Sequence, residues 1–440
     1  MDFDEALQYL LSLGHETLAI KLGLRNTELL LSALDNPHQS FPAVQIAGTN
    51  GKGSTASFLD SICGCAGIKT GLYTSPHLES ITERIKIGGT EISREDFARY
   101  TTAVRDAAIR LHNNLVIEAL PTFFEHVTAI ALLAFQEAGI ELAILETGLG
   151  GRLDATTAVA ADLCAITDIS FDHEEYLGNT IQSIAAEKAA IIHKGSTAVI
   201  APQRAEVLAV IWKRCKEVGV EPVYKCMPMV EQVSEDGRCQ VTFTTSTNLY
   251  EKIWLGLRGR HQVENACLAI QLAEVLRGRE FAITQDAINR GLESASHPGR
   301  LELIGETPVC LLDGAHNPSG ARALQAFLTE FGRKPLTIIF GAMRDKRIDQ
   351  VAEYLFPMAD ELILTTIDSP RTASVETLLG VAKKLKVRNV TTTATSREAI
   401  SLALEQTPNS GMICITGSLY LIGETRKLIR QRAKTMHKTT

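Results

Sequence analysis

The sequence predicts an α/β protein with two domains, each built on a mostly parallel sheet that helices cover. Three observations predict this class. Apolar runs alternate with segments of helical periodicity over most of the chain, which is the pattern of repeated βα units. The runs are nearly continuous in apolar residues, as in parallel strands that are covered on both faces. At 440 residues, the chain is also longer than one hydrophobic core usually serves.

The elements of the first half follow in order. A helical stretch over residues 2–13 and a loop precede the first strand. We expect strands at 43–47, 69–73, 141–145, 163–167 and 198–201, with helices at 54–66, 94–110, 121–138, 181–193 and 205–218. Residues 221–257 change to short alternating segments, which predict an antiparallel excursion, and a helix is expected at 262–277.

The turn His297-Pro-Gly-Arg300 interrupts both periodicities and predicts a hinge. Beyond it a second βα alternation predicts strands at 309–312, 336–340, 361–365, 389–393 and 412–416, with helices between them. We therefore expect one domain over residues 1–296 and a second over residues 297–440.

Composition excludes several classes of protein. The net charge of −7 and the lack of a long basic run argue against a general nucleic-acid binder. Nine cysteines without paired spacing indicate neither a structural zinc site nor a disulfide framework. The N-terminus is acidic where a signal peptide would be basic, and the apolar runs are too short to span a membrane. We expect a soluble, cytoplasmic protein.

A glycine-rich turn follows the first predicted strand and leads into a helix. Its glycines let backbone N–H groups approach phosphate oxygens, Lys52 supplies a point charge, and Ser54 or Thr55 can bind Mg²⁺ at the helix N-terminus. The spacing is not that of the standard phosphate loop, because Ile46 replaces the first glycine and Gly53 separates the lysine from the serine. An ordinary glycine-rich turn is the alternative, but the segment favours ATP chemistry.

Polar residues gather where the predicted strands end. Ser75 follows the second strand, Glu146 the third, and residues 168–173 the fourth. Ligands of parallel sheets bind beyond the carboxyl ends of the strands, so these groups suit Mg²⁺ ions that bridge ATP oxygens. Glu146 is poorly placed for a solvated face and is therefore a candidate ligand. His173 is an unusual magnesium ligand, and a loop histidine bonded to backbone is its alternative interpretation.

Lys188 lies within an apolar helical segment. It could extend its ammonium to solvent or pair with Glu187 or Glu174. The alternative is a lysine whose lowered pKa permits reaction, for instance with CO₂.

These residues belong to a longer series of short motifs, which occur in one order between about residue 20 and residue 425. The motifs are Gly48-Thr-Asn-Gly-Lys-Gly-Ser54, Thr74-Ser-Pro-His-Leu78, Glu83-Arg-Ile85, Phe124-Glu125, Glu146-Thr-Gly-Leu-Gly-Gly-Arg-Leu-Asp-Ala155, Asp172-His173, Leu177-Gly178, Glu187-Lys-Ala189, His261-Gln-Val-Glu-Asn265, Pro298-Gly-Arg300, Asp313-Gly-Ala-His-Asn-Pro318, Gly341-Ala-Met-Arg-Asp-Lys346 and Thr416-Gly-Ser-Leu-Tyr420. The series resembles the folylpolyglutamate synthase and dihydrofolate synthase family of the Mur ligase superfamily.

The resemblance implies a P-loop ATP-binding N-terminal domain, a Rossmann-like C-terminal domain and an active site in the cleft between them. It implies a ligase in which ATP phosphorylates a substrate carboxylate and the amine of L-glutamate then displaces the phosphate. The implied cofactors are ATP and Mg²⁺. The implied substrates are dihydropteroate or a reduced folate, with no nucleic-acid or membrane partner, and the family suggests a monomer.

Residue by residue, the resemblance implies roles at five groups of positions. The catalytic residues would be Lys52, Glu146, His173 and Lys188, the last of them carbamylated. ATP would contact Gly48, Thr49, Asn50, Gly51, Lys52, Gly53, Ser54, Asn265, Arg300 and Asp313. Metal ligands would be Ser54, Ser75, Glu146 and His173. The pterin substrate would lie near Arg84, Thr122, Phe123, Phe124, Glu125, Leu153, Asp154 and Ala155. The incoming glutamate would contact His316 and Ser418.

Substrate preference is the finer question. Either Phe123 or Phe124 could stack on a pterin ring, or both could be core residues of their helix. The similarity of Phe124-Glu125 and Leu153-Asp-Ala155 to the bifunctional bacterial type predicts both synthase activities, with a folylpolyglutamate synthase alone as the alternative.

Three positions depart from the family pattern. Thr157 replaces the usual asparagine after Asp-Ala-Thr, Ala190 the usual glycine after Glu-Lys-Ala, and Arg347 the usual aspartate at the end of Asp-Lys-Asp. None removes a catalytic group, so the departures concern substrate preference rather than the reaction.

Two other functions compete with this interpretation. A Mur ligase of the peptidoglycan type would also carry a phosphate loop and a carbamylated lysine, but the Ser-Pro-His-Leu and Asp-Gly-Ala-His-Asn-Pro segments favour the folate branch. A nucleotide-binding regulator without catalysis is the second alternative. The joint presence of Lys52, Glu146, His173 and Lys188 argues against it.

Overall fold

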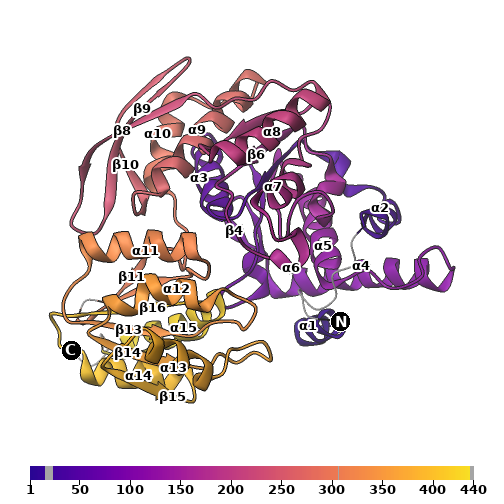
Figure 1. The fold of residues 1–440 in the computed structure, drawn as a ribbon. Coiled ribbons are helices and arrows are strands. Elements are labelled where there is room, and N and C mark those ends of the chain that lie inside the picture. Colours follow the sequence, from indigo (N-terminus) through magenta and orange to yellow (C-terminus); the bar gives the residue numbers. More distant parts are fainter. Residues whose placement is uncertain (15–22, 306, 437–440) are drawn as a thin grey trace.

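The computed structural model describes residues 1–14, 23–305 and 307–436, with side chains described as far as residue 430. Residues 20–22, where the resemblance to the ligase family begins, lie outside the described residues. Figure 1 shows two bodies, the larger one from indigo to salmon and the smaller one in orange and yellow. None of the described helices is long and apolar enough to cross a membrane.

A seven-stranded sheet forms the centre of the larger body, in the order β4-β3-β2-β5-β1-β6-β7. Five parallel strands lie where the apolar runs predict them: β1 (Ala43–Ala47), β2 (Thr70–Tyr73), β5 (Leu142–Glu146), β6 (Leu163–Ile166) and β7 (Thr197–Ile200). Two short antiparallel strands, β3 (Ile85–Ile87) and β4 (Thr90–Glu91), extend one edge. The sequence analysis missed this hairpin because three and two residues are too few for a recognisable alternation.

Helices cover both faces of this sheet. One core joins it to α1 (Phe3–Ser12), α2 (Arg25–Ser32), α4 (Arg94–Asn113) and α5 (Phe123–Ala138). A second core joins it to α3 (Lys52–Cys65), α9 (Gln262–Gly278) and α10 (Gln285–Ser294). A third lies at the β7 edge with α6 (Glu174–Leu177), α7 (Ile181–Ala189) and α8 (Ala205–Val218). Short 3₁₀ helices occur at η1 (Pro37–Ser40), η2 (Ile81–Arg84) and η3 (Ala155–Val159).

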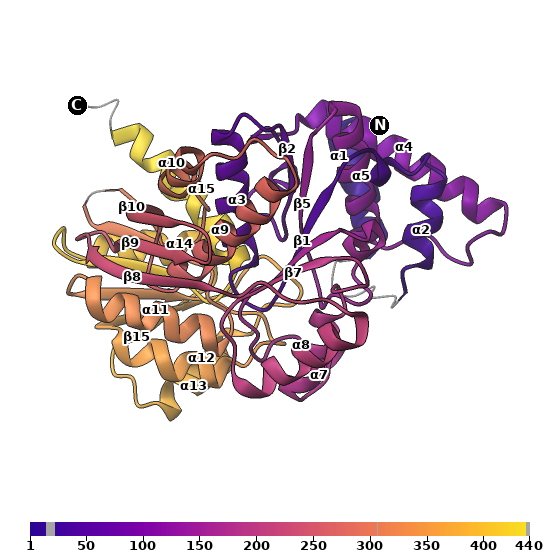
Figure 2. The same cartoon turned by 90° about the horizontal axis from the view of Figure 1, so that it is seen from above.

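Residues 226–258 form the antiparallel excursion that the alternating segments predict. The strands β8 (Cys226–Val233), β9 (Arg238–Thr245) and β10 (Leu249–Arg258) make a three-stranded sheet in the order β10-β9-β8, packed over α9 and α10. In Figures 1 and 2 this sheet extends away from α2 and α4 toward α11. A Cβ at Gly237, in the turn between β8 and β9, would lie 2.3 Å from the ring of Phe327 on α11. The excursion therefore reaches the second body.

A six-stranded sheet forms the smaller body, in the order β11-β12-β16-β13-β14-β15. Its strands are β11 (Glu302–Ile304), β12 (Val309–Asp313), β13 (Leu336–Phe340), β14 (Glu361–Thr365), β15 (Val390–Thr393) and β16 (Met412–Thr416), all parallel except β11. Its helices are α11 (Pro318–Phe331), α12 (Ile348–Leu355), η4 (Phe356–Met358), α13 (Val375–Lys384), α14 (Ser396–Gln406) and α15 (Leu419–Met436). Two cores, one on each face of the sheet, hold them.

The two bodies also touch through the loop that follows β2. A Cβ added at Gly423 of α15 would lie only 1.9 Å from the carbonyl oxygen of Leu78, so the two segments are in close contact. Beside it, Arg426 of α15 pairs with Glu79 at 2.5 Å and with Glu302 at 2.9 Å. The boundary near residue 297 stays a prediction.

Some element ends differ from the expectations. The helix expected at 181–193 ends at Ala189, followed by a turn that leads to Gly195 with φ 89°. The helix expected from residue 121 begins at Phe123, because Thr122 is its N-cap and forms a capping box with Glu125. Helices α2, α6 and α10 and strand β11 were not predicted.

Candidate active site

The phosphate loop joins β1 to α3 and is held by the segment after β6. The amide of Asn50 donates to Asp168 at 3.1 Å and to the hydroxyl of Ser170 at 3.0 Å. The ammonium of Lys52 turns back to the loop, where it donates to the carbonyls of Gly48 and Thr49 at 3.2 and 3.3 Å. Lys52 is also the first residue of α3, so its ammonium lies close to the positive N-terminal end of a helix, which favours anion binding.

Two glycines of this loop allow other elements to approach. Gly51 has φ 87°, and a Cβ there would lie 2.2 Å from the side-chain oxygen of Asn265. A Cβ at Gly53 would lie 2.8 Å from the ring of His297 and 3.3 Å from Glu146. The structure therefore brings Asn265, from α9, and the hinge residue His297 against the loop. This close approach is possible because Gly51 and Gly53 have no side chain.

Glu146 ends β5 and is buried beneath the loop. Its carboxylate accepts a hydrogen bond from the backbone N–H of Ser75 at 3.2 Å. Burial raises the pKa of Glu146, while the charges of Lys52 and Arg300 oppose the rise. Among the described residues, no three His, Cys, Asp or Glu side chains are grouped so that they could hold a metal ion. Of the four expected metal ligands, Ser54, Ser75, Glu146 and His173, only Glu146 carries a carboxylate.

Lys188 lies in the interior, which excludes the solvent-exposed alternative. Its side chain is buried, and its ammonium donates to the carbonyl of Gly48 at 2.8 Å. Neither expected carboxylate partner is available, because Glu187 pairs with Arg152 at 3.0 Å and Glu174 with Arg347 at 2.5 Å. Burial, helped by the nearby charge of Lys52, lowers the pKa of Lys188 to about 7. A substantial fraction of its amine is therefore neutral at neutral pH.

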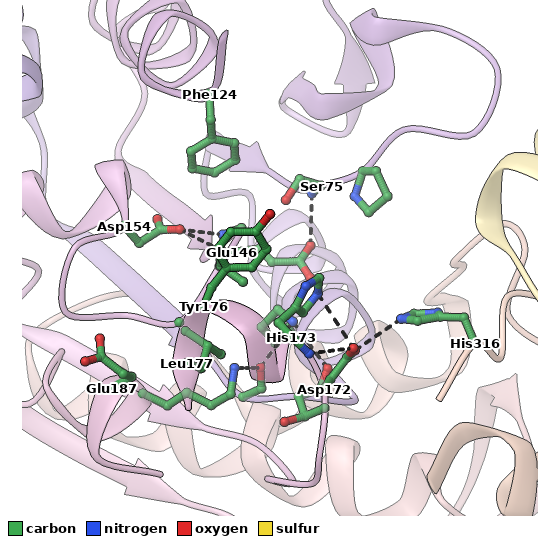
Figure 3. Close-up of a pocket in the computed structure, with 18 of the residues that line it drawn as sticks. Ser75, Phe124, Glu146, Asp154, Asp172, His173, Tyr176, Leu177, Glu187 and His316 are labelled. Carbon is green, nitrogen blue, oxygen red and sulfur yellow. Dashed lines mark hydrogen bonds and ion pairs between the residues drawn. The ribbon is translucent and has the colours of Figure 1, made fainter. Parts of the chain in front are cut away.

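His173 precedes α6 in the left-handed conformation, with φ 53° and ψ 37°. Burial lowers the pKa of His173 to about 3, so the ring is neutral at neutral pH. A neutral imidazole is the form that binds metals. Figure 3 shows its side chain beside Asp172 and below Glu146, at the centre of the pocket.

Asp172 lies at the centre of this group of side chains, although the sequence placed it only in a motif and gave it no role of its own. Lys346 pairs with it at 2.7 Å, His316 lies 3.4 Å from it, and His173 lies 3.8 Å from it. Burial disfavours its ionised form, but contacts with His173, His316 and Lys346 outweigh this cost and hold the pKa of Asp172 well below its ordinary value. Figure 3 shows His316 reaching it from the opposite side of the pocket.

Asn317 was also quoted without a role. It stands next to His316, and its amide donates to the side chain of Asn50 at 2.9 Å and of Asp172 at 3.4 Å. The signal that could have found these residues is complementarity between two motifs, an acidic residue before His173 and a lysine that ends the motif at Lys346.

A cavity of about 260 Å³ lies beside these residues. Phe124 faces it, as Figure 3 shows, with its ring 5.9 Å from that of Tyr73. A Cβ at Gly148 would lie 2.5 Å from the Phe124 ring, so the ring rests on the glycine backbone. Phe123 is a buried core residue instead. The structure thus assigns the two phenylalanines to different environments, and only Phe124 can meet a ligand here.

The other expected pterin residues divide in the same way. Thr122, Glu125, Leu153, Asp154 and Ala155 line the cavity. Arg84 is not among its lining residues; it is buried, donates to His77 at 2.8 Å and lies over the Phe123 ring at 5.5 Å.

Asp154 and Glu125 have structural partners. The Asp154 carboxylate accepts from the backbone N–H groups of Gly148, Leu149 and Thr156 at 2.8, 2.9 and 3.0 Å, and from the Thr156 hydroxyl at 2.5 Å. It therefore shapes the loop that forms the cavity wall. Glu125 closes the capping box of α5 and accepts from the hydroxyl of Thr27 at 3.1 Å.

A second cavity, of about 550 Å³, lies over the phosphate loop. Its wall combines the loop with Asn265, Arg300 and the beginning of α11. Asp313, at the end of β12, also lines it, but its carboxylate accepts from the backbone N–H groups of Leu301 and Ala315, both at 3.0 Å. Asp313 thus fixes the turn after the hinge.

The two cavities share part of their walls. Thr49, Lys52, Glu146, Arg300 and His316 line both. Ser418 lines the smaller cavity. The site therefore offers a place for a phosphorylated ligand and a place for a ring-containing ligand, with two cations, a histidine and a carboxylate at the junction.

Comparisons with known proteins agree on one family. Residues 46–273 match the Mur ligase middle domain, and residues 299–419 match the Mur ligase glutamate ligase domain. The chain is 34% identical over 95% of its length to the dihydrofolate synthase/folylpolyglutamate synthase of Bacillus subtilis, of which it covers 97%. It is 35% identical over 97% of its length to a probable bifunctional folylpolyglutamate synthase/dihydropteroate synthase of Halobacterium salinarum, but covers only 51% of that protein. The chain thus spans about half the length of this relative.

A solved structure is similar over nearly the whole chain. It is the folylpolyglutamate synthase of Mycobacterium tuberculosis complexed with ADP and AMPPCP, with a TM-score of 0.89 and 31% identity over 97% of this chain and 99% of that one.

Proposed function

The chain belongs to the Mur ligase family, among the dihydrofolate synthases and folylpolyglutamate synthases, and from this membership we propose that it is an ATP-dependent ligase of folate metabolism. It joins L-glutamate to dihydropteroate and to the γ-carboxylate of reduced folates. The observation that carries the proposal is the common wall of the two cavities, where Lys52 and Arg300 face Glu146 and His316. We further propose that it acts as a monomer in the cytoplasm.

The reaction has two steps. ATP lies in the larger cavity with its γ-phosphate at the common wall, and the carboxylate of the pterin substrate approaches from the smaller one. A carboxylate oxygen forms a bond to the γ-phosphorus while the bond to the β-phosphate oxygen breaks, which gives an acyl phosphate and ADP. The amine of glutamate then attacks the acyl carbon, loses a proton, and inorganic phosphate leaves.

The protein contributes mainly position and charge to this reaction. Lys52, whose ammonium already lies beside the carbonyls of the loop, can turn toward the transferring group. Arg300 approaches the same place from the hinge, where it donates to the Gly314 carbonyl at 3.4 Å. His316 and Ser418 come from the C-terminal domain and are the proposed contacts of glutamate.

The residues fit a magnesium ion, although they do not form an all-protein cage. Mg²⁺ usually binds one or two protein oxygens together with phosphate oxygens and waters. Glu146 supplies a carboxylate, Ser54 and Ser75 supply hydroxyls, and His173 supplies a neutral ring. When bound, the ion would offset negative charge on the phosphates.

We propose that Lys188 is carbamylated in the active enzyme. The ammonium first loses a proton, the neutral amine then adds to the carbon of CO₂, and a second proton leaves, so the side chain changes from a cation to an anion. The carbamate keeps one N–H, which can still donate to the Gly48 carbonyl that the amine now contacts at 2.8 Å. The pKa of the Lys188 amine, about 7, makes this reaction possible at neutral pH.

Phosphate release by the purified protein tests the function. We expect release with ATP, glutamate and dihydropteroate, and also with ATP, glutamate and a tetrahydrofolate, and only background release when glutamate is omitted. Activity with the tetrahydrofolate alone would leave a folylpolyglutamate synthase. Inactivity with both pterins would contradict the proposal. A thermal shift with UDP-muramoyl peptides and none with pterins would then indicate a peptidoglycan-type ligase.

A further inference from the structure

A bidentate ion pair joins the two domains beside the active site. Arg347 donates to the two carboxylate oxygens of Glu174 at 2.6 and 2.5 Å. Its guanidinium carbon also lies 4.9 Å from the centre of the Phe171 ring. Arginine suits this place because its planar group can form two parallel hydrogen bonds and stack on a ring at the same time. The sequence analysis noted Arg347 only as a departure from the family pattern.

Arg347 contacts the residues on either side of the pair Asp172-His173 in the sequence. Phe171 precedes this pair of residues and Glu174 follows it. Asp172 and His173 line the smaller reaction cavity, whereas Arg347 lines neither reaction cavity. It borders a separate space of about 80 Å³ next to them. Arg347 therefore holds the segment from outside and cannot itself touch the reacting groups.

Two other arginine pairs cross between the domains, and they attach elsewhere. Arg260 pairs with Glu330 of α11 at 2.6 Å, and Arg426 pairs with Glu79 at 2.5 Å. Neither contacts the segment that contains His173. Among these three pairs, the one formed by Arg347 joins the C-terminal domain to the segment that contains His173.

We infer that Arg347 is a positioning residue of the ligase reaction, which sets the place of Asp172 and His173 when the cleft is closed. The inference rests on the proposed function. An ion pair with about a third of its arginine exposed is weak when isolated, but here it selects one arrangement of a segment that Lys346 and His316 also contact. Loss of the pair lowers the fraction of protein in the competent arrangement, and the apparent affinity for ligands that need that arrangement falls with it.

The test compares Arg347→Ala and Glu174→Ala with the charge exchange Glu174→Arg/Arg347→Glu. Each single variant should lower kcat/KM for ATP about tenfold and raise the Mg²⁺ concentration needed for half activation. The exchanged pair should recover at least half of the loss on a logarithmic scale.

Arg99→Ala is the matched control. Arg99 also pairs with two carboxylates, Asp96 at 3.0 Å and Glu137 at 2.7 Å, and lies 4.2 Å from the Tyr100 ring, but all its partners are in its own domain. This variant should have wild-type kinetics. Kinetics of Arg347→Ala within twofold of wild type, or no recovery in the exchanged pair, would overturn the inference.

Hydrogen exchange makes the test independent of the reaction. Amides of residues 171–177 should exchange faster in Arg347→Ala than in wild type or in Arg99→Ala. Equal protection in all three proteins would overturn the inference even if the enzyme were active. A wild-type protein that released no phosphate with either pterin would contradict the proposed function, while the exchange result would still decide the role of Arg347.

Discussion

The ammonium of Lys188 lies 2.8 Å from the carbonyl oxygen of Gly48, so a buried lysine of α7 touches the first residue of the phosphate loop. The contact joins α7, in which the sequence left the role of Lys188 open, to the glycine-rich motif of the phosphate loop. It places any modification of Lys188 next to the phosphate loop.

Carbamylation of Lys188 can be observed directly. Protein in ¹³C-bicarbonate at neutral pH should show a carbamate carbon resonance that is absent from Lys188→Ala. The variant should lose at least about 99% of its activity, as when a charged group at a phosphoryl-transfer site is removed, and short-chain carboxylic acids should restore part of it. A wild-type spectrum without the resonance, or an electron-density map with a bare amine in bicarbonate, would refute the modification.

Substitution of Lys52 by alanine should abolish ATP turnover without unfolding the protein. Among the described residues, the ammonium donates to two carbonyl groups of its own loop, so we expect the fold to tolerate its loss. We expect kcat to fall by about 10²-fold or more and the circular dichroism spectrum to match wild type. Turnover within a few-fold of wild type would show that the phosphate loop is wrongly assigned.

Phe124 and Asp154 should respond differently to substitution. Phe124→Ala should raise KM for the pterin substrates about fivefold, because a ring contact contributes on the order of 1 kcal/mol, and leave KM for ATP unchanged. The resemblance places Asp154 near the pterin substrate, and from this alone Asp154→Ala would be expected to lose the dihydropteroate reaction preferentially. Because Asp154 accepts four hydrogen bonds within its loop, we now expect both reactions to be lost together. The variant should also be less stable by about 2–4 kcal/mol. Selective loss of one reaction in a fully stable Asp154→Ala would favour a direct pterin contact.

Stability should depend on pH through Lys188. Its pKa is about 7 in the folded protein and about 10.4 in the unfolded chain, so the unfolded chain binds more protons between these values. Stability therefore rises with pH from about 7 to 10 and does not change through this group below pH 7. Urea unfolding of CO₂-free samples should show that wild type gains more stability than Lys188→Met over this interval. Parallel curves for the two proteins would contradict the lowered pKa.

Closure of the cleft should depend on ionic strength. Glu174–Arg347 and Arg260–Glu330 are partly exposed ion pairs between the domains, and salt screens partly exposed charges. Small-angle scattering should show a larger radius of gyration for the free protein at 0.5 M salt than at about 0.05 M. An ATP analogue together with a pterin should restore the compact form. Identical profiles in all conditions would indicate a rigid cleft.

The sequence was sufficient for the parallel strands because apolar runs such as 336–340 and 412–416 are buried on both faces and need no partner to be recognised. It was insufficient for β3, β4 and α6, which are held by tertiary contacts over very few residues. The sequence also could not predict that Lys188 is buried or that Phe123 and Phe124 lie in different environments. Helical periodicity shows which residues share one face of a helix, but not which residues pack against that face. The ion pairs Asp172–Lys346 and Glu174–Arg347 join residues 174 and 173 positions apart, and no local pattern records them.

The five residues that line both cavities have a consequence for inhibitor design. A compound that linked a pterin-like ring to a phosphonate through a carboxylate-sized spacer would occupy both spaces without crossing solvent. Its two ends would then bind as one ligand, and the second contact would form at a high effective concentration. The spacer would meet Lys52, Glu146 and Arg300, so its charge as well as its length would decide how tightly the compound is held.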